Sequence, residues 1–146
     1  MSRPLQLHPD LQALIDSLLS FAKSMLVEEG SFNPFGAIMD TGGAIQWVAA
    51  DSGEEFPASQ VSIDILTNTF KEMAASGDVR AATICYDALA VPPGKTVKVD
   101  AIGFALEHRS GESVTALIPY IRGENKDVDC GDLFTVERSP PFFEIR

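Results

Sequence analysis

The chain has 146 residues, of which 45% are hydrophobic and 22% are charged, and it carries a formal net charge of −10. A length of this order indicates one domain, and the apolar fraction excludes an intrinsically disordered tail. A chain this acidic lacks the clustered lysine and arginine that sequence-independent binding to nucleic acid requires. No stretch reaches the roughly 18–20 apolar residues of a membrane span. We therefore expect neither nucleic acid nor a membrane as a partner.

The cysteine content and the N-terminus predict a cytoplasmic protein. The two cysteines are Cys85 and Cys130, whereas small disulfide-dependent secreted domains are usually richer in cysteine. The segment from Met1 to Pro9 has no apolar run followed by a small-residue cleavage site, which a secretory signal peptide needs.

The first half of the chain predicts a helix, a hairpin and a second helix. Apolar residues recur at spacings of three and four from Leu11 to Leu26, which predicts a helix over about 9–29. Two apolar runs, 35–39 and 44–50, are separated by the turn residues Asp-Thr-Gly-Gly at 40–43. The second helix is expected to begin at Ser59, a suitable N-cap, and to end at Gly77.

The second half predicts three strands, at roughly 79–90, 96–108 and 113–121, joined by Pro-Pro-Gly-Lys and Arg-Ser-Gly-Glu turns. The order is therefore α-β-β-α-β-β-β plus a C-terminal tail. This order predicts an α+β fold with two main helices and a single antiparallel sheet of about five strands. We interpret residues 1–146 as a single domain, with its core over about 9–121 and the tail, 122–146, packing on that core.

Symmetric turns would place Ile84 and Tyr86 opposite small residues of the next strand, with Ile118 and Tyr120 on that same face. The other face would carry Ile102, Phe104, Leu106 and Leu117. Both faces of the sheet are then apolar, which is unusual for an antiparallel sheet covered on one side. A helix on each side, the C-terminal tail or a second subunit could supply the second cover, and the last option predicts a homodimer.

One ligand-site hypothesis comes from the same register, in which Asp87 directly opposes Asp100. Opposed like charges are unfavourable. Either the register is shifted, or this end of the sheet is solvated, or a cation or a basic side chain such as Lys98 lies between the two carboxylates. The last possibility gives three candidate ligand-binding residues: Tyr86, Asp87 and Asp100.

Other chemical motifs have structural interpretations. The Asp-Thr-Gly at 40–42 resembles the signature of aspartic proteases, but that family is nearly all β, and we interpret the motif as a hairpin turn. The symmetric register separates Cys85 from His108 too widely for proton transfer. Two cysteines and two histidines without short spacing predict no zinc site. We expect no catalytic residue, no metal and no cofactor.

Three strings resemble those of an uncharacterised group of small bacterial proteins over roughly residues 12–137: Asn33-Pro34-Phe35-Gly36, Cys85-Tyr86-Asp87 and Leu106-Glu107-His108-Arg109-Ser110-Gly111. This resemblance implies a bacterial origin and one domain, and it transfers no catalytic residue. The element order is also similar to that of roadblock and profilin-like domains. That likeness implies dimers that scaffold other proteins, but fold alone does not fix function.

These observations favour a non-enzymatic interaction module that self-associates, as a dimer, and binds a protein partner. The alternative is a small-ligand-binding protein or an enzyme with a pocket near Tyr86, Asp87 and Asp100. An aspartic protease is a third hypothesis, and it would need proteolysis at acid pH that is lost on Asp40→Asn.

Overall fold

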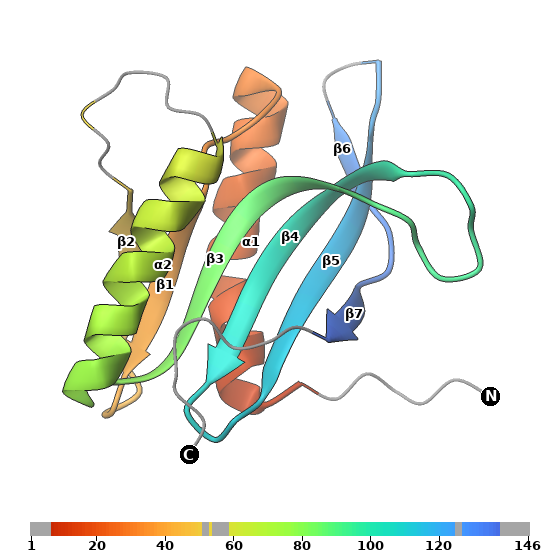
Figure 1. Ribbon diagram of the computed structural model, residues 1–146. Helices are drawn as coiled ribbons and strands as arrows, with labels where there is room; N and C mark the ends of the chain where they lie inside the picture. Colours follow the sequence, from red (N-terminus) through yellow and green to blue (C-terminus); the bar gives the residue numbers. More distant parts are fainter. Residues whose placement is uncertain (1–6, 51–52, 54–58, 125–126, 138–146) are drawn as a thin grey trace.

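A computed structural model of the chain describes residues 7–50, 53, 59–124 and 127–137. The helices are α1 (Pro9–Glu29) and α2 (Ser59–Ser76). The strands, in chain order, are β1 (Phe35–Asp40), β2 (Ile45–Ala49), β3 (Val79–Ala90), β4 (Val99–His108), β5 (Ser113–Arg122), β6 (Val128–Cys130) and β7 (Phe134–Glu137). The α+β class and the single antiparallel sheet are confirmed (Figure 1).

Within the described residues the sheet has seven strands rather than about five, in the order β2-β1-β3-β4-β5-β6, with β7 also paired to β5. The two additional strands come from the segment predicted as a tail. Strand β6 pairs with the C-terminal end of β5, and β7 pairs with its N-terminal half. They are only three and four residues long, which is too short for an alternating apolar pattern to identify a strand.

Helix α1 has the predicted bounds because both of its ends are capped. Nδ1 of His8 accepts a hydrogen bond from the N–H of Asp10 at 3.0 Å, and Pro9 occupies the first turn. At the other end, Gly30 adopts φ 84° and its N–H donates to the carbonyl of Leu26 at 3.1 Å. Such a left-handed terminus favours glycine.

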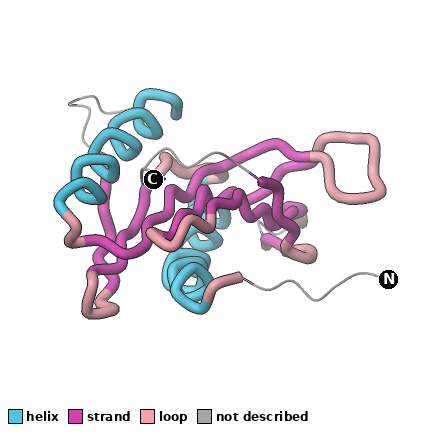
Figure 2. Tube along the Cα trace, turned by 60° about the horizontal axis from the view of Figure 1, so that its bottom comes forward, coloured by secondary structure: helices cyan, strands magenta, loops and turns pink. Residues whose placement is uncertain are grey.

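The two helices lie on opposite faces of the sheet (Figures 1 and 2). On one face, α1 buries residues such as Leu14 and Leu18 against Phe104 and its neighbours. On the other, Leu66 and Phe70 of α2 form a smaller core with residues of β1 and β3. The second apolar face could have been covered by a helix, by the C-terminal tail or by a second subunit. The structure shows the first arrangement, with one helix on each side of the sheet. Neither helix in the described part of the chain has the length and apolar character needed to cross a membrane.

The symmetric register predicted for the β4–β5 hairpin is wrong by one residue. Ile118 lies opposite Ile102, not opposite a small residue. The connecting loop spans residues 109–111 and ends in Gly111 with φ 106°. A three-residue loop that ends in a left-handed glycine shifts the pairing by one. Ile118 and Tyr120 consequently lie on the face of the sheet that packs against α1, which we call the α1 face, and they belong to the core between α1 and the sheet.

The register predicted for β3 and β4 is wrong by two residues. Tyr86 lies opposite Gly103, and Asp87 lies opposite Ile102, so Asp87 and Asp100 do not directly oppose each other. The shift occurs because the pairing ends at Ala90 and Val99, which leaves a longer loop than a four-residue turn. A two-residue shift keeps each side chain on its predicted face.

The Asp-Thr-Gly-Gly segment forms the turn between β1 and β2, as predicted. One carboxylate oxygen of Asp40 accepts hydrogen bonds from the N–H groups of Gly42 and Ala44, each at 2.9 Å. The backbone N–H of Asp40 donates to the carbonyl of Ala44 at 2.9 Å. The carboxylate thus stabilises the turn.

Candidate functional site

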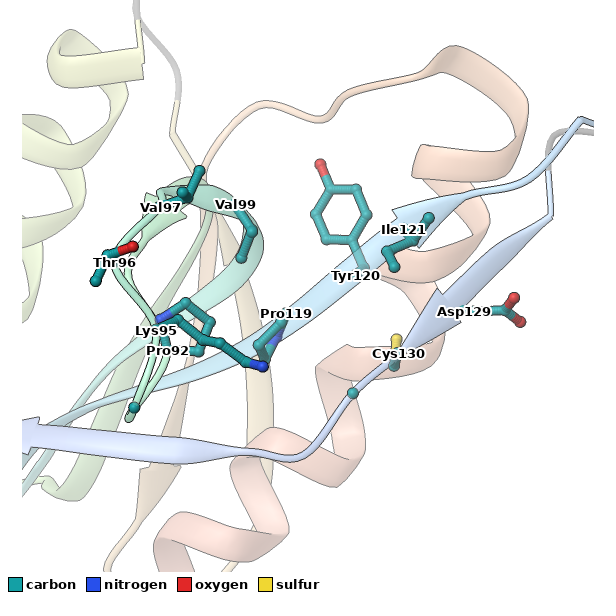
Figure 3. Close-up of a pocket in the computed structure, with 12 residues that line it drawn as sticks. Pro92, Lys95, Thr96, Val97, Val99, Pro119, Tyr120, Ile121, Asp129 and Cys130 are labelled. Atoms are coloured by element: carbon teal, nitrogen blue, oxygen red, sulfur yellow. The ribbon is translucent and has the colours of Figure 1, made fainter.

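A pocket of about 520 Å³ opens where the β3–β4 loop approaches β5 and β6 (Figure 3). Its wall comes from four segments that are distant in the sequence: the loop after β3, the start of β4, the end of β5, and β6 with the residue that follows it. The volume lies within the range typical of small-molecule sites.

The lining of the pocket is mainly apolar, and two of its side chains are highly exposed. Val97 is 69% exposed and Ile121 is 74% exposed. Leu89, at 66%, stands near the end of β3, which leads into the same loop. The polar groups of the lining include the ammonium of Lys95 and the carboxylate of Asp129. This combination suits an apolar ligand or an apolar surface of another protein.

Tyr120 connects the pocket to one of the predicted site residues. It lines the pocket, and its hydroxyl donates a hydrogen bond to Oδ1 of Asp87 at 2.7 Å. Burial raises the pKa of Asp87, the hydrogen bond from Tyr120 opposes that rise, and the negative charge of Asp100 adds to it. Burial and the contact with Asp87 also raise the pKa of Tyr120, so the hydroxyl keeps its proton at neutral pH.

The three predicted ligand-binding residues are not brought to one place. Asp87 lies opposite Ile102 on the face of the sheet that packs against α1. Asp100 is two residues before Ile102 in β4, so it lies on the same face, diagonal to Asp87. Tyr86 points to the opposite face, where its ring lies against Gly103. A Cβ at Gly103 would come within 2.7 Å of that ring, so the ring would have to move if the glycine were replaced. None of the three predicted residues lines the pocket.

Asp87→Asn is expected to raise the melting temperature at pH 7 by about 2 °C, and to leave it unchanged near pH 3. The folded-state pKa of Asp87 is raised, so the protein loses stability as the pH rises from the unfolded pKa to the folded one. An asparagine oxygen still accepts from Tyr120 and carries no charge. Thermal unfolding at both pH values measures the effect.

Asp129→Asn is the matched control, because it changes the net charge equally at an exposed position. It should leave the melting temperature nearly unchanged at both pH values. A lower melting temperature for Asp87→Asn at pH 7 would contradict the prediction and would mean that the ionised carboxylate stabilises the fold.

A polar cluster lies at the opposite end of β4, where the start of α1 meets the β4–β5 turn. Oδ2 of Asp10 lies 2.8 Å from Nε2 of His108, and Oδ1 of Asp10 accepts from Arg80 at 3.0 Å. The ring of His8 stacks on that of His108, with centroids 3.9 Å apart. Burial raises the pKa of Asp10, but His108 and Arg80 outweigh it, so this pKa lies below its ordinary value.

The sequence does not predict this cluster, because its ligands are not at the short spacing that is typical of metal-binding motifs. His8 and His108 are far apart in the sequence, and the pairing of α1 with the end of β4 brings them together. His8, Asp10 and His108 offer ligand atoms that all lie within 4.8 Å of one another. The signal available in the sequence was the short His8-Pro9-Asp10 segment at a helix start.

The two cysteines have different environments. Cys85 is buried in the α1-face core, opposite Phe104, and burial raises the pKa of its thiol. Such a thiol is a poor nucleophile at neutral pH. Cys130 is exposed and forms part of the pocket wall.

No family model, curated protein or solved structure matches this chain. The resemblances to a group of small bacterial proteins and to roadblock and profilin-like domains therefore stay predictions.

Proposed function

We propose that this protein is a non-enzymatic interaction module that self-associates through the pocket and its exposed apolar rim. The observation that supports this proposal most directly is a large, mainly apolar pocket flanked by two side chains that are at least 69% exposed, Val97 and Ile121. Apolar surface of this kind on a small protein is typical of an interaction site.

The occupant we propose is a second copy of the chain. A two-fold interface uses the same surface on both subunits. The interface surface of each subunit must therefore contain both protruding groups and a hollow that receives those of the other subunit. Here the protrusions, Val97 and Ile121, and the hollow belong to one surface. In such an arrangement the apolar rim of each copy would be buried against the pocket of the other.

The charge of the chain sets a condition on this dimer. Each copy carries a net charge of −10, so two copies repel each other at long range. Salt screens that repulsion. Salt does not weaken the free energy gained by burying apolar surface. The dimer should therefore become tighter as the ionic strength increases.

Val97→Asp is expected to weaken the dimer by at least about tenfold in Kd, because it would bury an unpaired carboxylate in an apolar interface. Val97 is 69% exposed in a loop, so the substitution should not disturb folding. Native mass spectrometry of the untagged protein and light scattering after size exclusion, over a range of concentrations, would measure the effect.

Val61→Asp is the matched control, because Val61 is 42% exposed on α2, away from the pocket. It introduces the same charge and should leave the dimer intact. A bare monomer of the wild-type chain at high concentration and high salt would contradict self-association. An unchanged dimer in Val97→Asp would show that the interface lies elsewhere.

A small-ligand-binding protein is the second candidate function, and the pocket volume favours it. Tyr120 and Lys95 would supply the few polar groups that orient an otherwise apolar ligand. The same native spectrum separates the two candidates. A monomer that carries stoichiometric additional mass would support the ligand, and a bare dimer would support the interaction module.

A further inference from the structure

The side chains of His8, Asp10 and His108 converge at the start of α1. Oδ2 of Asp10 lies 2.8 Å from Nε2 of His108 and 3.7 Å from Nδ1 of His8, and all three ligand atoms lie within 4.8 Å of one another. Around a tetrahedral ion with bonds of about 2.0–2.2 Å, ligand atoms are about 3.4 Å apart. The rings of His8 and His108 are stacked, so their nitrogen lone pairs do not yet converge, and the partly exposed ring of His8 must turn for one ion to contact all three side chains.

We propose that His8, Asp10 and His108 bind one divalent first-row transition-metal ion, with Zn²⁺ as the reference case. Two imidazole nitrogens and one carboxylate oxygen form a donor set that suits these ions, whereas Ca²⁺ and Mg²⁺ prefer oxygen ligands alone. The site lies at the other end of β4 from the pocket, so it does not rest on the proposed self-association.

The fold brings the three ligands close together before any ion binds. His8 caps α1, Asp10 lies in the first turn of α1, and His108 is the last residue of β4. The side chain of His108 is 9% exposed and that of Asp10 is 17% exposed, whereas the side chain of His8 is 35% exposed. The site is therefore buried on one side and open on the other, where water can complete the coordination.

Neighbouring groups already orient two of the ligands. Arg80 donates to Oδ1 of Asp10 at 3.0 Å, which leaves Oδ2 directed toward both imidazoles. Oγ of Ser110 lies 3.0 Å from Nδ1 of His108, on the far side of the ring from the carboxylate. Outer partners of this kind, a carboxylate held by a donor and an imidazole held by an oxygen, are common around bound metal ions.

The local charge also permits a divalent cation. Arg80 adds a positive charge beside the site, but Asp10 supplies one carboxylate and Glu112 a second. Oε2 of Glu112 accepts a hydrogen bond from the backbone N–H of His8 at 3.2 Å, so this carboxylate lies next to the ligands. Two negative charges thus oppose the single charge of the guanidinium.

Binding of the ion requires a proton to move within His108. In the structure the backbone N–H of Ser110 lies 3.1 Å from Nδ1, which places the ring proton on Nε2, facing Asp10. A metal ion needs the lone pair of Nε2. The proton must therefore move to Nδ1, where Oγ of Ser110 can accept its hydrogen bond once the ring has turned away from the backbone N–H of Ser110. At His8, the ion replaces the N–H of Asp10 as the partner of Nδ1.

The first experiment titrates chelator-treated full-length protein with Co²⁺, monitored by visible absorption, and with Zn²⁺, monitored by calorimetry and by the melting temperature. We expect one ion per chain and a higher melting temperature with Zn²⁺, because the ion binds the folded chain. His8→Gln should weaken binding by about tenfold or more, and Ser110→Ala by about 10–100-fold. His8 is partly exposed, so its replacement is a safer test than replacement of His108.

Cys130→Ser is the control, because Cys130 is an exposed soft ligand outside the site. This variant should bind the ion as tightly as the wild type. Nitrogen NMR of the two histidines gives a second readout, since His108 should change from the Nε2–H to the Nδ1–H tautomer when Zn²⁺ binds. The proposal is overturned by a lack of saturable binding to the wild type, by unchanged binding in His8→Gln, or by binding that is lost in Cys130→Ser.

Discussion

Replacement of Gly36 by alanine is expected to lower the free energy of unfolding by about 3 kcal/mol, which is near the upper end for an overpacked core. A Cβ on Gly36 would lie 2.6 Å from the carbonyl oxygen of Thr83 and 2.7 Å from Cζ of Phe70. The carbonyl belongs to the neighbouring strand, so only movement of β1 relative to β3 could relieve the first contact. The ring of Phe70 is buried between α2 and the sheet and has little room to move.

Chemical denaturation and thermal unfolding would measure this effect, and the melting temperature should fall by about 10 °C. Gly42→Ala is the matched control. Gly42 lies in the β1–β2 turn, and the nearest atom to its added Cβ, an oxygen of Asp40, is 3.4 Å away. The control should change the stability little. Equal stability of Gly36→Ala and the wild type would mean that β1, β3 and α2 are not packed as described.

Phe104→Ala is expected to lower the free energy of unfolding by about 3–5 kcal/mol, because it leaves a cavity in the larger core. Phe104 has no exposed surface and lies at the centre of the sheet, opposite Cys85 on one side and Ala116 on the other. Its small neighbours cannot expand to fill the space, and α1 would have to move toward the sheet to do so.

Phe21→Ala provides the comparison for Phe104→Ala. Phe21 belongs to α1 and is 42% exposed, with edge contacts to Phe35 and Trp47. The loss of these contacts should cost about 1 kcal/mol. Urea denaturation of both variants would test the difference, and similar losses in the two would contradict the assignment of Phe104 to the centre of the core.

Local sequence signals predicted the helices well. The spacing of apolar residues from Leu11 to Leu26, with Pro9 and Gly30 at the ends, predicted the bounds of α1 that the structure shows. The turn at 40–43 was equally predictable, because the side chain of Asp40 bonds to backbone groups within four residues of it. These features depend on interactions between residues close in the chain.

Strand pairing was less predictable. A change of one residue in the length of a connecting loop moves every side chain of the next strand to the other face of the sheet. The sequence Arg-Ser-Gly-Glu is compatible with a loop of two or three residues. The left-handed conformation of Gly111 selects three, and this choice places Ile118 and Tyr120 beneath α1. The short strands β6 and β7 were missed for a related reason, since they are defined by their partner β5 more than by their own apolar pattern.

The sequence by itself determined the α+β class, the order of the elements and the apolar character of both faces of the sheet. Each of these follows from periodicity and turn residues, which act over a few positions in the chain. Only the tertiary structure decided that α2 packs on the second face over β1 and β3, that Tyr86 and Asp87 point to opposite sides, and that Tyr120 contacts Asp87. It also brought His8 to His108 and formed the pocket from segments that are distant in the sequence. These contacts join residues far apart in the chain, and their geometry depends on the register of every intervening strand.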